Sequence, residues 1–248
     1  MTSRLIAQAA RNNALWCDKV CAAHGRPGEF HETLWLNRRG VPRYYPDAVT
    51  LAGAGSAAAQ TEAIAALVES PRQSAWTVKD SFACLDLDKQ GFLPLFDAEW
   101  LHMQAPIRDA SRQSENLQWR RVSSGADLIG WEQEWAATDP DVGKSRLFTP
   151  GLLSEPDILF VRLLVNGATV GGGILNCGPG IVGLSNLFVR SIDLEAAWRG
   201  LVRAAATTFP GLALVGYDRG DELAAAHRVG FATIGPLRVW RRPPTTPG

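Results

Sequence analysis

Cysteine is scarce in this sequence, and long uninterrupted hydrophobic runs do not occur in it. The 248 residues include 4 cysteines, too few for a disulfide framework in a chain of this length, so we expect reduced thiols. The most apolar stretch, residues 158–165, contains Arg162, whereas a membrane-spanning helix needs about 18 or more apolar residues in succession. The sequence therefore predicts neither a disulfide-stabilised scaffold nor a membrane span.

An excess of charge of either sign is also missing. Lys and Arg number 25, as do Asp and Glu, which gives a formal net charge of zero at pH 7. Without a net field the chain has no general attraction to nucleic acid or to an anionic membrane, so we expect neither as a partner. Residues 1–13 lack the apolar core of a secretory signal, and we expect a cytoplasmic protein.

The chain does have enough apolar residues for a buried core. Hydrophobic residues make up 46% of it, and its length suits one large domain or two small ones. In the N-terminal part, hydrophobic spacing and turn residues predict helices at 5–24 and after the stretch AGAGSAAAQTE, and extended segments or strands at 29–37, 42–51, 75–87 and 92–102.

The C-terminal part alternates strands and helices. Asn166-Gly167 is a strong hairpin signal between two apolar strands. We expect strands at 117–122, 157–165, 168–176, 181–189, 212–216 and 231–240, and helices at 125–137, 193–208 and 221–229. The order predicts a mixed α/β (α+β) fold with an N-terminal α/β region at 1–105, a polar linker at 106–116, a second domain at 117–240 and a flexible tail at 241–248.

Residues 117–240 resemble the Gcn5-related N-acetyltransferase (GNAT) superfamily. The resemblance rests on the hairpin DILFVRLLVNGATVGGGIL, the strands IVGLSNLFV and LALVGY, and Gly230-Phe231 before the last strand. It implies a GNAT-like mixed central sheet flanked by helices, with acetyl-CoA or another acyl-CoA lying between two splayed parallel strands. The N-terminal region carries no recognisable GNAT motif. It is either a degenerate second GNAT-like copy or an extension of this branch.

The resemblance also implies a cofactor site on the strand IVGLSNLFV. Backbone groups of Leu187, Phe188 and Val189 would bind the thioester and the pantetheine arm, and Arg190 follows them. The helix that begins near Asp193 would face the diphosphate, because helix N-termini bind anions.

Two features depart from the family pattern. The family's phosphate loop reads Q/R-x-x-G-x-G/A, whereas residues 190–195 read RSIDLE. Both glycines are missing and two carboxylates stand in the first helical turn, which Arg190 and Arg199 would offset in part. The tyrosine that many relatives use as general acid is replaced by Ala226, so Tyr217 and His227 are the candidate catalytic residues.

Two further groups of residues have alternative interpretations. Lys79, Asp80 and Asp86 would bind an amine substrate if they lined a pocket, and would form a solvated sheet face otherwise. Cys17 and Cys21 share a helix face with a histidine, but the spacing matches no known zinc motif, so we expect buried thiols and no metal. The 9 tryptophans are spread over the predicted elements, which indicates core packing.

Together these observations predict an acyl-CoA-dependent N-acyltransferase, acetyltransferase-like, whose acceptor is a small-molecule amine or a protein amine. The alternative is a catalytically inactive GNAT-fold protein that binds a small ligand or a partner protein, because the glycine loop and the tyrosine are both absent. The sequence does not indicate an oligomeric state.

Overall fold

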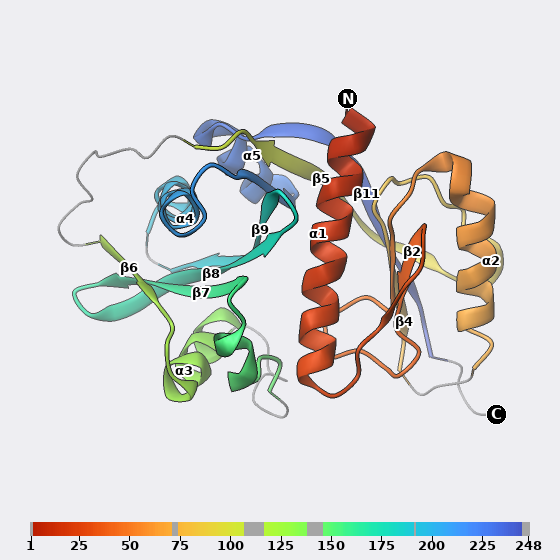
Figure 1. The fold of residues 1–248 in the computed structure, drawn as a ribbon, viewed down its shortest axis with the longest axis horizontal. Coiled ribbons are helices and arrows are strands. Elements are labelled where there is room, and N and C mark those ends of the chain that lie inside the picture. Colours follow the sequence, from red (N-terminus) through yellow and green to blue (C-terminus); the bar gives the residue numbers. More distant parts are fainter. Residues whose placement is uncertain (1, 71–73, 107–116, 138–145, 191, 245–248) are drawn as a thin grey trace. The chain divides into compact units, whose positions relative to one another are not determined.

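The computed structural model of the chain describes residues 2–70, 74–106, 117–137, 146–190 and 192–244 (Figure 1). Contacts divide the chain into two compact units, of which unit 1 is Met1–Trp100 with Ile234–Gly248 and unit 2 is Leu101–Thr233. The strands β5 (Leu93–Met103) and β11 (Ala232–Arg242) each begin in one unit and end in the other. Residues 107–116 of the expected linker lie outside the described residues.

Unit 1 combines two helices with a mixed sheet. Its further elements are α1 (Thr2–Ala23), β1 (Glu29–Phe30), β2 (Leu34–Leu36), β3 (Ala48–Thr50), the short 3-10 helix η1 (Ala54–Ser56), α2 (Ala57–Leu67), β4 (Trp76–Asp80) and η2 (Asp88–Gln90). The strand order is β1-β2-β3-β4-β11-β5. Strands β3 and β4 are parallel and α2 connects them, whereas β11 is antiparallel to β4.

Helix α2 covers the strands of unit 1 with a narrow apolar face (Figure 1). Ile64 and Leu67 are buried on this helix and pack with Leu36, Ala48 and Val78 of the neighbouring strands. Burial of large aliphatic side chains at about 1.5 to 3 kcal/mol each stabilises this layer.

Unit 2 contains the predicted alternation of strands and helices as far as the helix expected at 221–229, whereas most of the strand expected at 231–240 belongs to unit 1. Its elements are β6 (Leu117–Arg121), α3 (Gly125–Trp135), η3 (Pro150–Ser154), β7 (Ile158–Val165), β8 (Ala168–Gly178), β9 (Ile181–Val189), α4 (Leu194–Thr208), β10 (Ala213–Asp218) and α5 (Gly220–Val229). The strands lie in the order β10-β9-β8-β7-β6, and the end of β5 lies beside β10. Strands β6 to β9 are antiparallel, and β9 and β10 are parallel with α4 as their connection.

The two faces of this sheet have different cores. Helices α3 and α4 lie on opposite sides of β7 and β8 (Figure 1). On the α4 side, Trp198 and Leu201 pack with Val182 and Leu214. On the α3 side the Trp131 ring contacts aromatic rings, with centroid distances of 5.6 Å to Phe148, 5.4 Å to Phe160 and 5.3 Å to Phe188.

Most sequence-based boundaries in unit 2 are confirmed, whereas the strands of unit 1 before β5 are shorter than expected. The segment 29–37 contains the short strands β1 and β2, and only Ala48–Thr50 of the segment 42–51 is a strand. Asn166 and Gly167 have φ angles of 50° and 81°, as the predicted tight hairpin requires. The expected strand at 75–87 is wrong beyond Asp80, because the Asp80 carboxylate accepts hydrogen bonds from the backbone N–H groups of Phe82 (3.3 Å) and Leu85 (2.8 Å) and turns the chain. Strand β11 extends to Arg242, and residues 245–248 of the expected tail lie outside the described residues.

All four cysteines are free. Cys17 and Cys21 are buried on α1, and burial raises the pKa of the two thiols to about 11 and about 12. In the part of the chain that the structure describes, no three His, Cys, Asp or Glu side chains gather closely enough to hold a metal ion. Among the same residues, no helix has both the length and the apolar composition that crossing a membrane requires.

Candidate functional site

The parallel strands β9 and β10 pair at their amino-terminal ends. The pairs are Ile181 with Ala213, Val182 with Leu214, and Gly183 with Val215. Both strands continue beyond these pairs, β9 to Val189 and β10 to Asp218. Because the register ends early, backbone groups of the second half of β9 face β10 without a partner in the parallel ladder.

A β-bulge lies in this second half of β9. Gly172 of β8 pairs with Phe188, but Ile174, two residues further along β8, pairs with Ser185, three residues away on β9. Strand β9 therefore has one extra residue, and Asn186 takes a φ angle of 54° there. A bulge changes the direction of the neighbouring backbone N–H and C=O groups. The expected cofactor residues Leu187, Phe188 and Val189 follow directly and form the end of β9.

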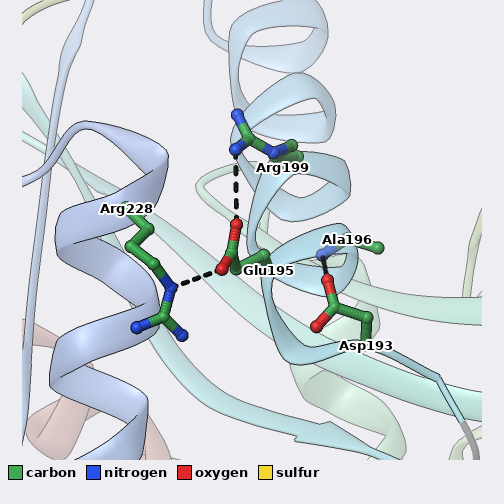
Figure 2. Close-up of polar contacts among 5 residues, drawn as sticks. All are labelled: Asp193, Glu195, Ala196, Arg199 and Arg228. Carbon is green, nitrogen blue, oxygen red and sulfur yellow. Dashed lines mark hydrogen bonds and ion pairs between the residues drawn. The ribbon is translucent and has the colours of Figure 1, made fainter.

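Helix α4 starts just after this strand, and its N-terminus is occupied by carboxylates of the chain (Figure 2). Asp193 is the N-cap residue and accepts a hydrogen bond of 3.0 Å from the backbone N–H of Ala196. The Glu195 carboxylate lies between two guanidinium groups, 3.5 Å from that of Arg199 and in contact with that of Arg228. Negative charge is favourable at a helix N-terminus, so these residues stabilise α4 as it stands.

Arg190, expected to bind the cofactor, contacts the end of α3 instead of the start of α4. Its guanidinium donates a hydrogen bond of 2.8 Å to the backbone carbonyl of Glu134 and lies 3.4 Å from the Glu134 carboxylate. Because both side chains are partly exposed, this ion pair contributes less than about 1 kcal/mol. Arg190 would thus be able to leave Glu134 for a bound anion at modest cost.

The two candidate catalytic residues lie on different elements. Tyr217 is near the carboxyl end of β10, where the pairing with β9 has ended. His227 is exposed in the last turn of α5, and its Nε2 lies 3.0 Å from the hydroxyl of Thr233. At about 1.5 Å per helical residue, His227 is on the order of 10 Å along α5 from the end of β10. Of the two, Tyr217 is the one that lies on a strand next to β9.

Asp218, next to Tyr217, was not predicted from the sequence. Burial raises the pKa of this carboxyl from 3.8 to about 7, and the nearby charge of Glu222 acts in the same direction. A single Asp at the end of a strand gives no sequence signal for such a shift, because the shift depends on desolvation in the folded state.

The three expected substrate residues all belong to unit 1, where they have contacts within the fold. Lys79 is buried, and its Nζ donates a hydrogen bond of 2.8 Å to the side-chain oxygen of Asn13. The buried Asp80 carboxylate ends β4, as described above. The Asp86 carboxylate accepts a hydrogen bond of 3.2 Å from the backbone N–H of Asp88. The residues proposed to bind the cofactor are in unit 2, and a role of the unit 1 residues in substrate binding stays a prediction.

Comparison with known proteins places this geometry in a fold family. No model of a known protein family matches the sequence, and no curated protein matches it. The structure is similar to a GCN5-related N-acetyltransferase from Kribbella flavida, with a TM-score of 0.61, 13% sequence identity and 96% of each chain covered. The chain has the GNAT fold.

Two further solved structures agree with this assignment. A GNAT-family protein from Novosphingobium aromaticivorans has a TM-score of 0.56 at 13% identity, covering 93% of this chain and 99% of that one. A GCN5-related N-acetyltransferase from Sphaerobacter thermophilus has a TM-score of 0.52 at 13% identity, covering 96% and 95%. The predicted GNAT resemblance and mixed α/β fold are therefore confirmed. The coverage extends over both units, so the N-terminal region has counterparts in these proteins.

A pair of glycines in unit 1 was not considered in the sequence analysis. Residues 50–55 read TLAGAG, which has the spacing x-x-G-x-G of the family's phosphate loop, and they connect β3 with α2. Neither Gly53 nor Ser56 provides a side-chain cap, and the first turn of α2 has no acidic residue. The glycine spacing is visible in the sequence, but only the structure shows that the glycines lie between parallel strands, in the connection from β3 to β4.

Proposed function

We propose that the chain is an acyl-CoA-dependent N-acyltransferase that transfers an acetyl or related acyl group to an amine. The observation that carries this proposal is the bulge at Asn186, placed where β9 and β10 no longer pair. Backbone N–H groups that do not pair with β10, and whose direction a bulge has changed, are suited to donate hydrogen bonds to a carbonyl oxygen on which negative charge develops.

The residues at the end of β9 fit the thioester end of such a cofactor. An acyl-CoA, when bound, supplies a carbonyl carbon activated by a sulfur leaving group. Backbone groups of Leu187, Phe188 and Val189 would orient that carbonyl and the pantetheine amides. Tyr217, at the carboxyl end of β10, would donate the proton that the leaving sulfur needs.

A diphosphate would bind at the start of α4 only by displacing carboxylates of the chain. Glu195 holds Arg199 and Arg228 in the structure, so an incoming phosphate would have to displace this carboxylate to reach the two guanidinium groups. Asp193 similarly occupies the N–H of Ala196. The cofactor would therefore bind in competition with charges of the chain itself.

A second candidate function follows from that competition. In a catalytically inactive GNAT-fold protein, Asp193 and Glu195 would permanently fill the anion position and the protein would bind another small ligand or a partner protein. The absence of the family's tyrosine at Ala226 favours the same interpretation.

Calorimetric titration distinguishes the two functions. We expect acetyl-CoA and CoA to bind with a dissociation constant of about 100 μM or tighter, worth roughly 5.5 kcal/mol, and CoA without its 3′-phosphate serves as the control ligand. Release of free CoA thiol in the presence of a panel of amines then tests transfer. No heat up to millimolar ligand would contradict the transferase and support the inactive alternative.

The variant Gly55→Val tests whether unit 1 binds the cofactor instead. A Cβ atom at Gly55 meets no atom within 4 Å, so the substitution fits the unliganded fold but would block close approach of a phosphate to the start of α2. We expect Gly55→Val to bind acetyl-CoA with the same affinity as the wild-type protein. Weaker binding by this variant would move the cofactor site to unit 1.

A further inference from the structure

Ser185 is the last residue of β9 before the bulge, and its position is defined by both neighbouring strands. It pairs directly with Ile174 of β8, so their side chains lie on the same face of the sheet. Gly172, two residues from Ile174, is on that face too, since a Cβ atom there would lie 2.8 Å from the Phe188 ring and would collide with Trp131 of α3. Ser185 therefore points to the α3 side.

Tyr217 is on the same face, at the same level of the sheet. Gly183 pairs with Val215, and Ser185 and Tyr217 each follow two residues later on parallel strands. Leu214, one residue before Val215, packs into the core on the α4 side, so Val215 and Tyr217 project to the opposite side. The serine and the tyrosine thus lie on one face where the two strands have stopped pairing.

The Ser185 hydroxyl is buried and lacks a hydrogen-bond partner among the described residues. Its Oγ atom is sealed from solvent, although the residue as a whole is half-buried. Leaving a buried hydroxyl without a partner costs about 1 to 3 kcal/mol. Several other buried side-chain atoms of the described residues also lack a partner, so the missing bond alone does not define a site. Ser185 differs in its place beside the bulge and on the face of Tyr217, where a ligand would supply the missing partner.

We infer that the Ser185 hydroxyl donates a hydrogen bond to the carbonyl oxygen of the acyl group during transfer. The inference rests on the proposed function and deepens it, because it assigns a side chain to the reacting atoms. In the step, the amine nitrogen forms a bond to the carbonyl carbon, and the carbon–sulfur bond breaks with its electron pair going to sulfur. Sulfur takes up one proton and the amine loses one. Ser185 keeps its proton throughout and stabilises the negative charge on oxygen.

Ser185→Ala, Ser185→Thr and the control Ser154→Ala test this assignment. Ser154 is exposed at the end of η3, so its substitution makes the same chemical change away from β9. Since removal of one oxyanion donor costs about 100-fold or more in kcat in other enzymes, we expect Ser185→Ala to lower kcat by at least about 10-fold. The KM for acetyl-CoA should change by less than about 3-fold, and Ser185→Thr, which keeps the hydroxyl, should recover most of the rate.

The melting temperature of the unliganded protein separates catalysis from structure. A hydroxyl without a partner does not stabilise the fold, so Ser185→Ala should melt at or above the wild-type temperature. An unchanged kcat in Ser185→Ala, or a loss of kcat that accompanies a lower melting temperature, would overturn the assignment while leaving the transferase in place. A wild-type protein that neither binds acetyl-CoA nor releases thiol would overturn the proposed function and this assignment with it.

Discussion

Glu195 is the residue whose replacement should most directly change the affinity for CoA. Its carboxylate stands in the first turn of α4 and binds Arg199 and Arg228 (Figure 2). The substitution Glu195→Gln keeps the size of the side chain, removes its charge and releases both guanidinium groups. We expect this variant to bind CoA more tightly than the wild-type protein.

The substitution affects folding stability and CoA affinity separately. The arginine side chains are 58% and 57% exposed and the Glu195 side chain 28%, so losing both ion pairs should lower the free energy of unfolding by about 1 kcal/mol or less. The effect on affinity comes from repulsion: for an assumed separation of roughly 8 Å between the carboxylate and a doubly charged diphosphate, in a medium between protein surface and water, the repulsion is about 1 to 2 kcal/mol. Affinity should therefore rise about 5- to 30-fold.

Calorimetric titration with CoA at about 0.05 M and about 0.5 M salt measures the affinity of both proteins. The gain in affinity of Glu195→Gln should be smaller at the higher salt concentration, because salt screens the repulsion. Glu155→Gln in the same unit makes the same charge change outside α4 and α5 and should alter the affinity little. If Glu195→Gln binds CoA no better than the wild-type protein, the start of α4 is not the diphosphate site.

Two other predictions concern stability. Gly172→Ala should lower the free energy of unfolding by about 2 to 4 kcal/mol, because its Cβ atom would lie 2.7 Å from the backbone oxygen of Val161, which cannot move aside; urea denaturation measures this, and a loss below about 0.5 kcal/mol would contradict the packing described. The second prediction is that Asp218→Asn changes the pH dependence of stability. Burial raises the Asp218 pKa from 3.8 to about 7, so between about pH 4 and pH 7 the folded wild-type protein binds a proton that the unfolded chain releases. The wild-type protein therefore loses stability as pH rises through this range. The variant should be more stable than the wild type at pH 8, by roughly 2 kcal/mol after allowing for partial exposure, and similar at pH 4. Equal pH dependence in both proteins would show that Asp218 ionises normally.

The elements of this fold follow from local sequence signals. Asn166-Gly167 could be assigned to a hairpin because few dipeptides adopt two consecutive positive φ angles readily. Asp193 preceded an apolar helical pattern and does cap α4. By contrast, the end of β4 depends on which backbone groups the Asp80 carboxylate reaches, and no local pattern specifies that.

The site was harder to predict, because it depends on pairing between distant strands. The bulge at Asn186 results from the register between β8 and β9, and neither Asn186 nor Ser185 is distinctive in the sequence. The missing partner of the Ser185 hydroxyl and the raised pKa of Asp218 both arise from burial in the folded chain. The contact of Arg190 with Glu134 likewise joins segments that periodicity cannot relate.

The pairing of β11 with β4 has a consequence for biosynthesis. Five residues of β4, from Trp76 to Asp80, pair with residues 238–242 of β11, which are translated only after the whole of unit 2. Until then one edge of β4 has no cognate strand, and an unpaired edge is a template for other polypeptides. A ribosome-bound chain, or one truncated before residue 234, would thus be prone to aggregation and strand exchange, and unit 1 can complete its sheet only post-translationally.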